Sequence, residues 1–380
     1  MINVYKNKVF IILQVCIILS IKYVYSQTNY EKYIKNNLLL FDTIHNQYID
    51  SLLGNKVFYV AGEWHNFEKE NRNVELTLFK YLYYYKNVRV FIMEYALSCE
   101  YFINKYLETG DENILIRLGN NCPKNVLDIS KELYKFYKTL NKYDKFKVKT
   151  IDEDISDLTI ILFKELFPKE EPPIEIRKSI EKIKNSMNLN NDEFIAFIKT
   201  IQNDIKIHED SYKKYLKNDF DFFIRNVEGA YLGCYLNKTK LKDSTVLKER
   251  ELFMYKNMLS IIKEYPNCSF FGQFGGDHTT NTIQKDFAEF KYWNSLISML
   301  NTNTDFPLKD KVLSMRITYY PFKLKRNDTV LEDNICIALS EYVKKSKIKL
   351  SDNILLFNVR GKDSPFMEYQ KVHDFILVVK

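Results

Sequence analysis

The sequence has few of the residues that build metal clusters, phosphate loops and nucleophilic turns. Its 380 residues include ten glycines, five histidines and six cysteines. No two cysteines show Cys-x-x-Cys spacing, which argues against a structural zinc cluster. The chain also contains no Gly-x-Ser-x-Gly turn, no Gly-x-Gly-x-x-Gly and no Walker lysine. A serine-hydrolase elbow and a phosphate-binding loop are therefore excluded.

Charge of one sign is also scarce. The net charge of +7 falls to +4 if an N-terminal signal containing Lys6, Lys8 and Lys22 is removed. The remaining lysines and glutamates are interspersed, so the sequence does not predict a nucleic-acid-binding surface. Apolar residues make up 46% of the chain and charged residues 28%, which is the balance of a globular protein. The length allows one large domain or two ordinary ones.

The first 26 residues have the pattern of a secretory signal. Lys6 and Lys8 precede an apolar-rich run from Val9 to Ile21, and Ser26 supplies a small residue for cleavage. The run is shorter than the roughly 20 apolar residues of a spanning helix. We therefore expect a secreted or periplasmic protein without a stable membrane span, with an uncleaved anchor as the alternative.

Five cysteines remain after removal of such a signal, and an odd number argues against a disulfide scaffold. They are Cys99, Cys122, Cys234, Cys268 and Cys336. Cys99 and Cys122 are the nearest pair in sequence, so one bridge between them is conceivable in an oxidising compartment. Buried free thiols are the alternative.

Apolar runs alternating with helical patterns predict an α/β fold with a mainly parallel central sheet flanked by helices. A lead-in helix is expected around Glu31 to Leu40. Strands are expected at 57–62, 88–93, 147–151, 268–273 and 312–320, and runs at 354–359 and 374–379 are expected to close the sheet with an antiparallel edge. Helices are expected between them, at 68–85, 96–108 and 128–143.

The pattern changes after Pro168. From Pro173 to Tyr265 only helical periodicity is found, and Pro172-Pro173 marks the break at which it begins. The expected organisation is therefore a signal peptide at 1–26 and one α/β domain in two parts, at 27–168 and 266–380. A helical insertion at 169–265 separates the two parts.

Acids and histidines follow the predicted strands. The stretch KVFYVAGEWH ends in Glu63 and His65, Glu94 follows the second strand, and CSFFGQFGGDH ends in His278. The carboxyl ends of parallel strands meet at one edge of a sheet, where ligands bind. Together with Asp152, which follows the third strand, these side chains are expected at one rim of the sheet, with His65, Glu94 and His278 around one pocket.

A helical motif adds a cation to these residues. In the pattern Arg250-Glu251-x-x-Met254-x-x-Asn257, spacings of four and three place Arg250, Met254 and Asn257 on one helical face. Three of the ten glycines lie between Gly272 and Gly276, where the backbone must approach another group closely or adopt a positive φ.

Other acids and histidines are assigned structural roles. Asp152 and Asp154 follow the third strand and are expected to cap the next helix rather than to act in catalysis. The remaining histidines, His45, His208 and His373, lack acidic partners in the sequence and are expected to be structural.

Together these motifs resemble the erythromycin esterase-like proteins: Gly-Glu-x-His after a strand, a glutamate after the next, Arg-acid-x-x-Met-x-x-Asn on a helix, and a late glycine-rich turn ending in histidine. The Gly-x-x-His ends at Gly62/His65 and Gly275/His278 also resemble the related Tiki and TraB proteases and the ChaN haem-binding lipoproteins. The resemblance covers residues 56–112 and 245–280 best. It implies the same parallel α/β sheet with helical insertions.

The chain departs from the esterases in two places. They usually have one more residue between the first glutamate and histidine, and a second histidine where this chain has Gly275. The Gly-x-x-His spacing is closer to the Tiki proteins, a resemblance that implies a divalent-metal hydrolase.

Two hydrolytic mechanisms use the same residues. In the first, His65, Glu94 and His278, or Glu63 in place of Glu94, bind Mn²⁺, Co²⁺ or Zn²⁺, and a metal-bound water attacks an ester or amide carbonyl. In the second, His65 is oriented by Glu94 or Glu63 and acts as a general base on water, while Arg250 stabilises the oxyanion. Either one predicts a small-molecule or peptide substrate.

Two further functions remain open at this point. One is a protein of the same fold that binds haem or another small ligand without turnover. The other is a degenerate member of the superfamily that has been retained as an interaction module. The sequence does not indicate the oligomeric state.

Overall fold

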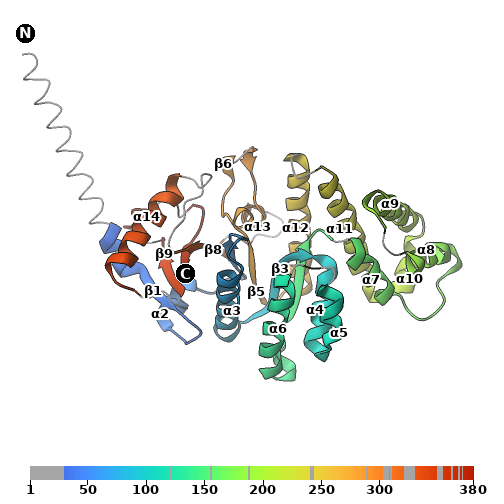
Figure 1. The fold of residues 1–380 in the computed structure, drawn as a ribbon, viewed down its shortest axis with the longest axis horizontal. Coiled ribbons are helices and arrows are strands. Elements are labelled where there is room, and N and C mark those ends of the chain that lie inside the picture. The colour runs from blue at the N-terminus through green and yellow to red at the C-terminus, as the bar shows by residue number, and fades with distance from the viewer. Residues whose placement is uncertain are drawn as a thin grey trace, which may run out of the picture.

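The fold is described from a computed structural model (Figure 1). It describes residues 30–380 except for short gaps at 120–121, 123, 155, 187–188, 240–243, 288–289, 303–307, 309, 321–329, 349–353, 361–362, 367–368 and 370. The predicted signal segment lies outside the described residues. Within those residues, none of the helices has the length and apolar character needed to cross a membrane.

Eight strands form one mixed sheet. In order across the sheet they are β1 (Leu38–Phe41), β9 (Ile354–Asn358), β10 (Phe375–Val379), β8 (Val312–Tyr319), β2 (Phe58–Glu63), β5 (Ser269–Gly275), β3 (Val88–Ala96) and β4 (Lys147–Asp152). The strands from β10 to β4 pair in parallel, whereas β9 runs antiparallel to both of its neighbours, β1 and β10. The α/β class is confirmed, and the antiparallel edge makes the sheet mixed.

The two faces of the sheet are covered by different helices because side chains alternate along each strand. Tyr59 and Ala61 of β2 pack in the cluster that includes α3 (Glu68–Tyr85), α4 (Leu97–Thr109) and α6 (Lys124–Thr139). Phe58 and Val60 of the same strand pack against α12 (Ser244–Glu264) and α13 (Leu296–Thr302). The central strands are therefore buried on both faces, with functional side chains left at their ends.

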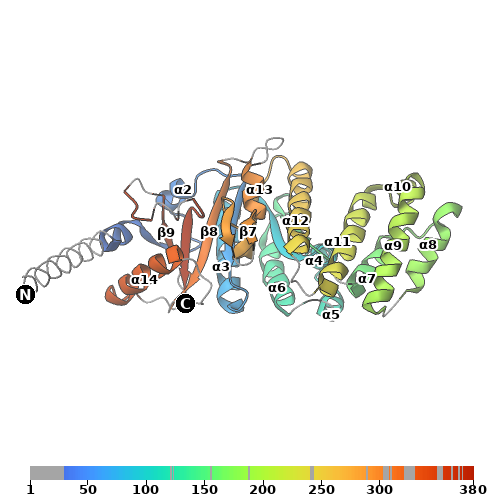
Figure 2. The same cartoon turned by 90° about the horizontal axis from the view of Figure 1, so that it is seen from above.

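The helices between β4 and β5 extend away from the sheet. They are α7 (Ser156–Leu166), α8 (Ile174–Asn185), α9 (Asn191–Ile207), α10 (Glu209–Leu216) and α11 (Phe220–Thr239), followed by α12. Figure 2 shows α8, α9 and α10 side by side at one end of the molecule, while α14 (Val330–Lys345) lies at the other. In contrast, α12 returns to the sheet, where Met254 and Met258 join its core.

Several elements differ from the sequence-based expectations. The lead-in helix predicted at 31–40 ends at residue 37, and residues 38–41 form the edge strand β1. Pairing of these apolar residues with β9 overrides their helical pattern. α2 (Gln47–Leu53) follows β1, and Gly54 is its C-terminal cap. The sequence did not predict α5 (Glu112–Gly119), α13, α14 or the hairpin of β6 (Gln284–Phe287) and β7 (Phe290–Trp293).

Cys99 and Cys122 lie close enough to form a disulfide. Their Sγ atoms are 2.9 Å apart, whereas a disulfide bond measures about 2.05 Å. Closing the bond needs a movement of less than about 1 Å. The hydrogen bond to Cys122, together with burial, raises the pKa of the Cys99 thiol well above its usual value, so exchange near neutral pH should be slow.

We expect exposure to oxidised glutathione to join Cys99 to Cys122 and to release two molecules of glutathione per disulfide formed. The protein mass should fall by two hydrogen atoms, and both thiols should become resistant to alkylation. Cys99→Ser should abolish the mass change, and Cys234→Ser should leave it unchanged. Continued alkylation of both thiols after prolonged oxidation would contradict the prediction.

Candidate active site

The ends of β2 and β5 lie side by side. The two strands pair in parallel, with Glu63 opposite Gly275. His65 follows β2, and its Nε2 lies 2.9 Å from the position that a β-carbon on residue 275 would occupy. A larger residue there would collide with the imidazole ring. Glycine at position 275 therefore lets His65 approach β5, and the first Gly-x-x-His end meets the second.

Glu63 orients His65. Glu63 Oε1 lies 3.1 Å from His65 Nδ1, while Glu63 Oε2 accepts a hydrogen bond of 2.5 Å from Gln273 Nε2. Because Nδ1 faces a carboxylate, the neutral imidazole carries its proton on Nδ1 and a lone pair on Nε2. The hydrogen bond with Glu63 raises the pKa of His65, burial opposes the rise, and the charge of Glu94 adds to it. The side chain of His65 is 69% exposed and lines the pocket described below, with its Nε2 beside Gly275.

Glu94 lies at the centre of the site. Its Oε1 is 3.0 Å from Arg250 Nη2 and 3.2 Å from His278 Nε2, and its Oε2 accepts a 2.6 Å hydrogen bond from the backbone N–H of Gly275. Burial alone would raise the pKa of Glu94. The charge and hydrogen bond of His278, with the charge of Arg250, outweigh burial and hold the pKa far below its usual range. Glu94 is therefore a carboxylate.

Arg250 binds two further acids behind Glu94. Its Nε lies 2.9 Å from Asp152 Oδ1 and 2.7 Å from Glu153 Oε2, and its Nη2 also bonds to Asp152. Burial and the neighbouring charge of Asp152 raise the pKa of Glu153 to about 8. The expectation that Asp152 serves as a helix cap is wrong: its carboxylate pairs with Arg250. Asp154 accepts a hydrogen bond of 2.5 Å from Ser98 Oγ.

His278 is buried between two acids. Its Nδ1 lies 2.6 Å from Glu251 Oε2, and its Nε2 faces Glu94. Burial alone would lower the pKa of His278, but Glu251 and Glu94 raise it well above its usual value, so the ring is an imidazolium at neutral pH. Glu251 also accepts a hydrogen bond from the backbone N–H of Leu296. From the sequence, Glu251 was a possible ion-pair partner of Arg250, the residue before it, but in the structure its carboxylate bonds to His278.

The other two residues of that motif anchor the helix. Met254 is fully buried beneath the sheet, and Asn257 Nδ2 donates a 3.0 Å hydrogen bond to the backbone oxygen of Ile151 in β4. The expected common face of Arg250, Met254 and Asn257 is confirmed. It holds α12 so that Arg250 reaches the ends of β3 and β4.

The residues as arranged do not fit a divalent metal. Among the described residues, no group of three or more His, Cys, Asp or Glu side chains is placed to hold an ion. Both nitrogens of His278 face carboxylates, and Arg250 Nη1 lies 3.4 Å from its Nε2. A guanidinium thus already lies against Glu94 and His278, and it would repel a second cation between them.

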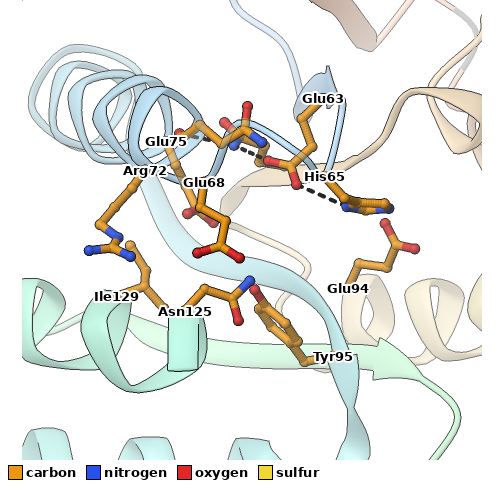
Figure 3. Close-up of a pocket in the computed structure, with 11 residues that line it drawn as sticks. Glu63, His65, Glu68, Arg72, Glu75, Glu94, Tyr95, Asn125 and Ile129 are labelled. Carbon is orange, nitrogen blue, oxygen red and sulfur yellow. Dashed lines mark hydrogen bonds and ion pairs between the residues drawn. The ribbon is translucent and has the colours of Figure 1, made fainter. Parts of the chain in front are cut away.

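A pocket of about 100 Å³ opens beside His65 on the α3 face of the sheet (Figure 3). The residues that line it are Glu63, His65, Glu68, Asn71, Arg72, Glu75, Glu94, Tyr95, Asn125, Ile129 and Gln273. Of the five residues predicted for the site, Glu63, His65 and Glu94 line this pocket. Arg250 and His278 do not line it and instead contact Glu94 from the α12 side.

Glu75 and Tyr95 line the pocket but were not predicted from the sequence. Glu68, Arg72 and Glu75 are spaced by four and three residues, which places them on one face of α3. That spacing was a signal, but a charged helix face is usually solvated. Tyr95 follows Glu94 in β3, and burial, then the charge of Glu75, raises its pKa, so its hydroxyl stays protonated.

Comparisons with known proteins show the fold. No protein-family model matches the chain, and no curated protein matches it. A mutant of the erythromycin esterase EreC in its open conformation aligns with a TM-score of 0.61 at 9% identity, over 90% of this chain and 97% of that one. A succinoglycan biosynthesis protein aligns with a TM-score of 0.62 at 12% identity, over 93% and 97%.

A haem-bound structure of ChaN from Campylobacter jejuni aligns with a TM-score of 0.29 at 13% identity, over 77% of this chain and 94% of that one. A score that low carries no argument for haem binding here. The resemblance to erythromycin esterase is confirmed at the level of the fold.

Proposed function

We propose that this protein is a hydrolase that cleaves an ester or amide bond with a water molecule activated by His65. The observation that carries the proposal is the Glu63–His65 hydrogen bond between two pocket-lining residues, which leaves the lone pair of Nε2 on the side of the ring away from Glu63. A histidine held by a carboxylate in this way is a general base. The fold shared with an erythromycin esterase supports the same reaction class.

In the proposed reaction, His65 Nε2 takes a proton from water as the water oxygen bonds to the carbonyl carbon. Glu63 stabilises the imidazolium that forms. The bond to the leaving alcohol or amine then breaks, and the imidazolium returns its proton to the leaving group. The products are an acid and an alcohol or amine, and His65 is again neutral.

The other residues of the site are proposed to position the catalytic groups and to polarise the substrate carbonyl. Tyr95 has the only hydroxyl among the pocket-lining residues, and its raised pKa keeps it a donor for the developing oxyanion. Arg250 and His278 hold Glu94 ionised beside His65. In this proposal Arg250 is a positioning residue, because its Nε and Nη2 are bonded to carboxylates.

We propose that the reaction needs no metal, since Arg250 supplies the positive charge beside Glu94 and His278. The N-terminal segment 1–26 supports export, so the substrate would be met outside the cytosol.

A panel of p-nitrophenyl esters and peptide amides tests this function. We expect hydrolysis that is unchanged by dialysis against a chelator and by added Mn²⁺, Co²⁺ or Zn²⁺. His65→Asn protein, purified identically, controls for contaminating esterases. Hydrolysis that is lost with the chelator and restored by one metal would contradict the metal-free mechanism. Equal hydrolysis by wild type and His65→Asn would contradict the function.

A further inference from the structure

Two of the four glutamates in the pocket already have partners within the site. Glu63 is paired with His65, at 3.1 Å, and Glu94 with Arg250, at 3.0 Å. The His65 ring therefore donates a hydrogen bond to Glu63, and the Arg250 guanidinium neutralises Glu94.

The other two, Glu68 and Glu75, form no ion pair within the described part of the chain. Arg72 also lines the pocket, but it already forms an ion pair with Asp128, with 3.0 Å between Nη2 and Oδ2. Burial and the charge of Glu63 raise the pKa of Glu75 well above its usual value, and Arg72 only partly offsets them. Glu75 is therefore held towards its protonated form, and a cation bound beside it would favour the carboxylate.

Gln273 adds an unpaired acceptor. The residue is 5% exposed, and its Nε2 donates to Glu63 Oε2 and, at 3.0 Å, to the backbone oxygen of Asn71. Both partners are acceptors, so the amide orientation is fixed and Oε1 is directed away from them. Oε1 is buried and has no hydrogen-bond partner among the described residues. A buried acceptor without a donor is costly, and a donor on a ligand would satisfy it.

Within the described part of the chain, the pocket is therefore lined by two carboxyl groups without an ion pair, those of Glu68 and Glu75, and the unpaired amide oxygen of Gln273 lies buried in its wall. Figure 3 shows Glu68 and Glu75 extending from α3 into the space that Tyr95 and Asn125 bound from the other side. Its volume of about 100 Å³ has room for roughly seven to ten water-sized groups. An alkyl chain ending in a charged nitrogen is of that size.

We propose that this pocket binds an alkylammonium or alkylguanidinium group of the substrate. The N–H donors of such a group would pair with the Glu68 and Glu75 carboxylates and the carbonyl oxygen of Gln273, while the reacting carbonyl lies at His65. The proposal adds a substrate class to the proposed hydrolase function. It rests on that function only in calling the bound molecule a substrate. An organic cation fits better than a metal ion, because no three ligating groups among the described residues converge to hold one.

Binding is tested first without turnover. Calorimetry with pentylamine, pentylguanidinium, pentanol and MnCl₂ separates an organic cation from an alkyl chain and from a metal. We expect both organic cations to bind at least about tenfold more tightly than pentanol, since a hydrogen bond to a charged group contributes about 1.5–3 kcal/mol. Equal binding of pentanol and pentylamine, or tight binding of Mn²⁺ that excludes pentylamine, would overturn the proposal.

Variants locate the binding. Glu75→Gln should weaken pentylamine binding about tenfold or more while pentanol binding changes little. Glu68→Gln, at an exposed position, provides a second variant that does not depend on tolerance of a change in the pocket wall. Glu132→Gln makes the same charge change on α6 outside the pocket and should leave binding unchanged. Undiminished pentylamine binding in both pocket variants would overturn the assignment of the site.

Turnover distinguishes this proposal from the proposed function. The p-nitrophenyl esters of N-acetyl-lysine and N-acetylnorleucine differ by the terminal ammonium. We expect kcat/KM to favour the lysine ester by about tenfold or more, and Glu75→Gln to bring the ratio towards one. Hydrolysis of both esters at equal rates would overturn the cation site and leave the hydrolase intact. Tight pentylamine binding with no hydrolysis of either ester would contradict the hydrolase and leave the cation site intact.

Discussion

Replacing Arg250 with methionine is expected to lower the free energy of unfolding by about 3–5 kcal/mol, the range for removing one partner of a buried ion pair. The side chain of Arg250 is 19% exposed, and those of Glu94 and Asp152 are each 9% exposed. Methionine keeps much of the apolar volume but leaves these carboxylates and Glu153 without their shared cation. The loss should appear as a lower urea midpoint with an unchanged m-value.

Arg177→Met is the matched control for this change. Arg177 pairs with Glu171 at 3.1 Å, but the two side chains are 40% and 87% exposed. An exposed pair contributes about 0–1 kcal/mol, so the control should unfold close to the wild-type midpoint. A combined Arg250→Met, Glu153→Gln, Asp152→Asn variant should recover part of the lost stability, because it removes the unpaired charge of Asp152 and the buried acid of Glu153. Equal midpoints for Arg250→Met and Arg177→Met would show that the buried network contributes little.

The sequence predicted the centre of the sheet because its signals there are local. The apolar strands and the residues that follow them, Glu63, His65, Glu94 and His278, depend on one rule about the carboxyl ends of parallel strands. The structure brings these residues together although 213 residues separate His65 from His278 in the chain. Parallel pairing of β2 with β5 and of β5 with β3 does this directly.

Elements at the edge of the sheet were missed because their conformation depends on distant partners. Residues 38–41 read as the end of a helix, but they pair with β9, more than three hundred positions later. The partner of Asp152 was missed for a similar reason. Its position before a helix favours a cap, and only the arrival of Arg250, 98 residues on, gives its carboxylate a stronger partner.

The pocket could not be predicted from one helix pattern. Glu68, Arg72 and Glu75 form a charged stripe on α3, which by itself indicates a solvated face. Burial of part of that stripe depends on α6 and on Gln273 of β5, which belong to other parts of the chain. Arg250 was expected to stabilise an oxyanion and is now proposed to position Glu94, for the same reason. Its place on the helix could be predicted from the sequence, but its carboxylate partners could not.

Replacing His65 with asparagine is expected to reduce kcat/KM for ester hydrolysis by about 10²–10⁴-fold, the usual contribution of a general base. Asparagine cannot accept a proton from water, although its amide can still bond to Glu63. The His65 side chain is 69% exposed, so the unfolding free energy should change by no more than about 0.5 kcal/mol. His208→Asn, at the end of α9, should leave both quantities unchanged.

The pH profile separates a base from a merely structural histidine. A general base works in its neutral form, so kcat/KM should rise with pH through the pKa of His65, which the bond to Glu63 places above the ordinary histidine value. Glu63→Gln removes that carboxylate, so the acid limb should move to lower pH while the plateau falls, because the ring is less firmly oriented. An acid limb that stays in place in Glu63→Gln, or one that persists in His65→Asn, would assign the titration to another group and remove His65 from the proposed mechanism.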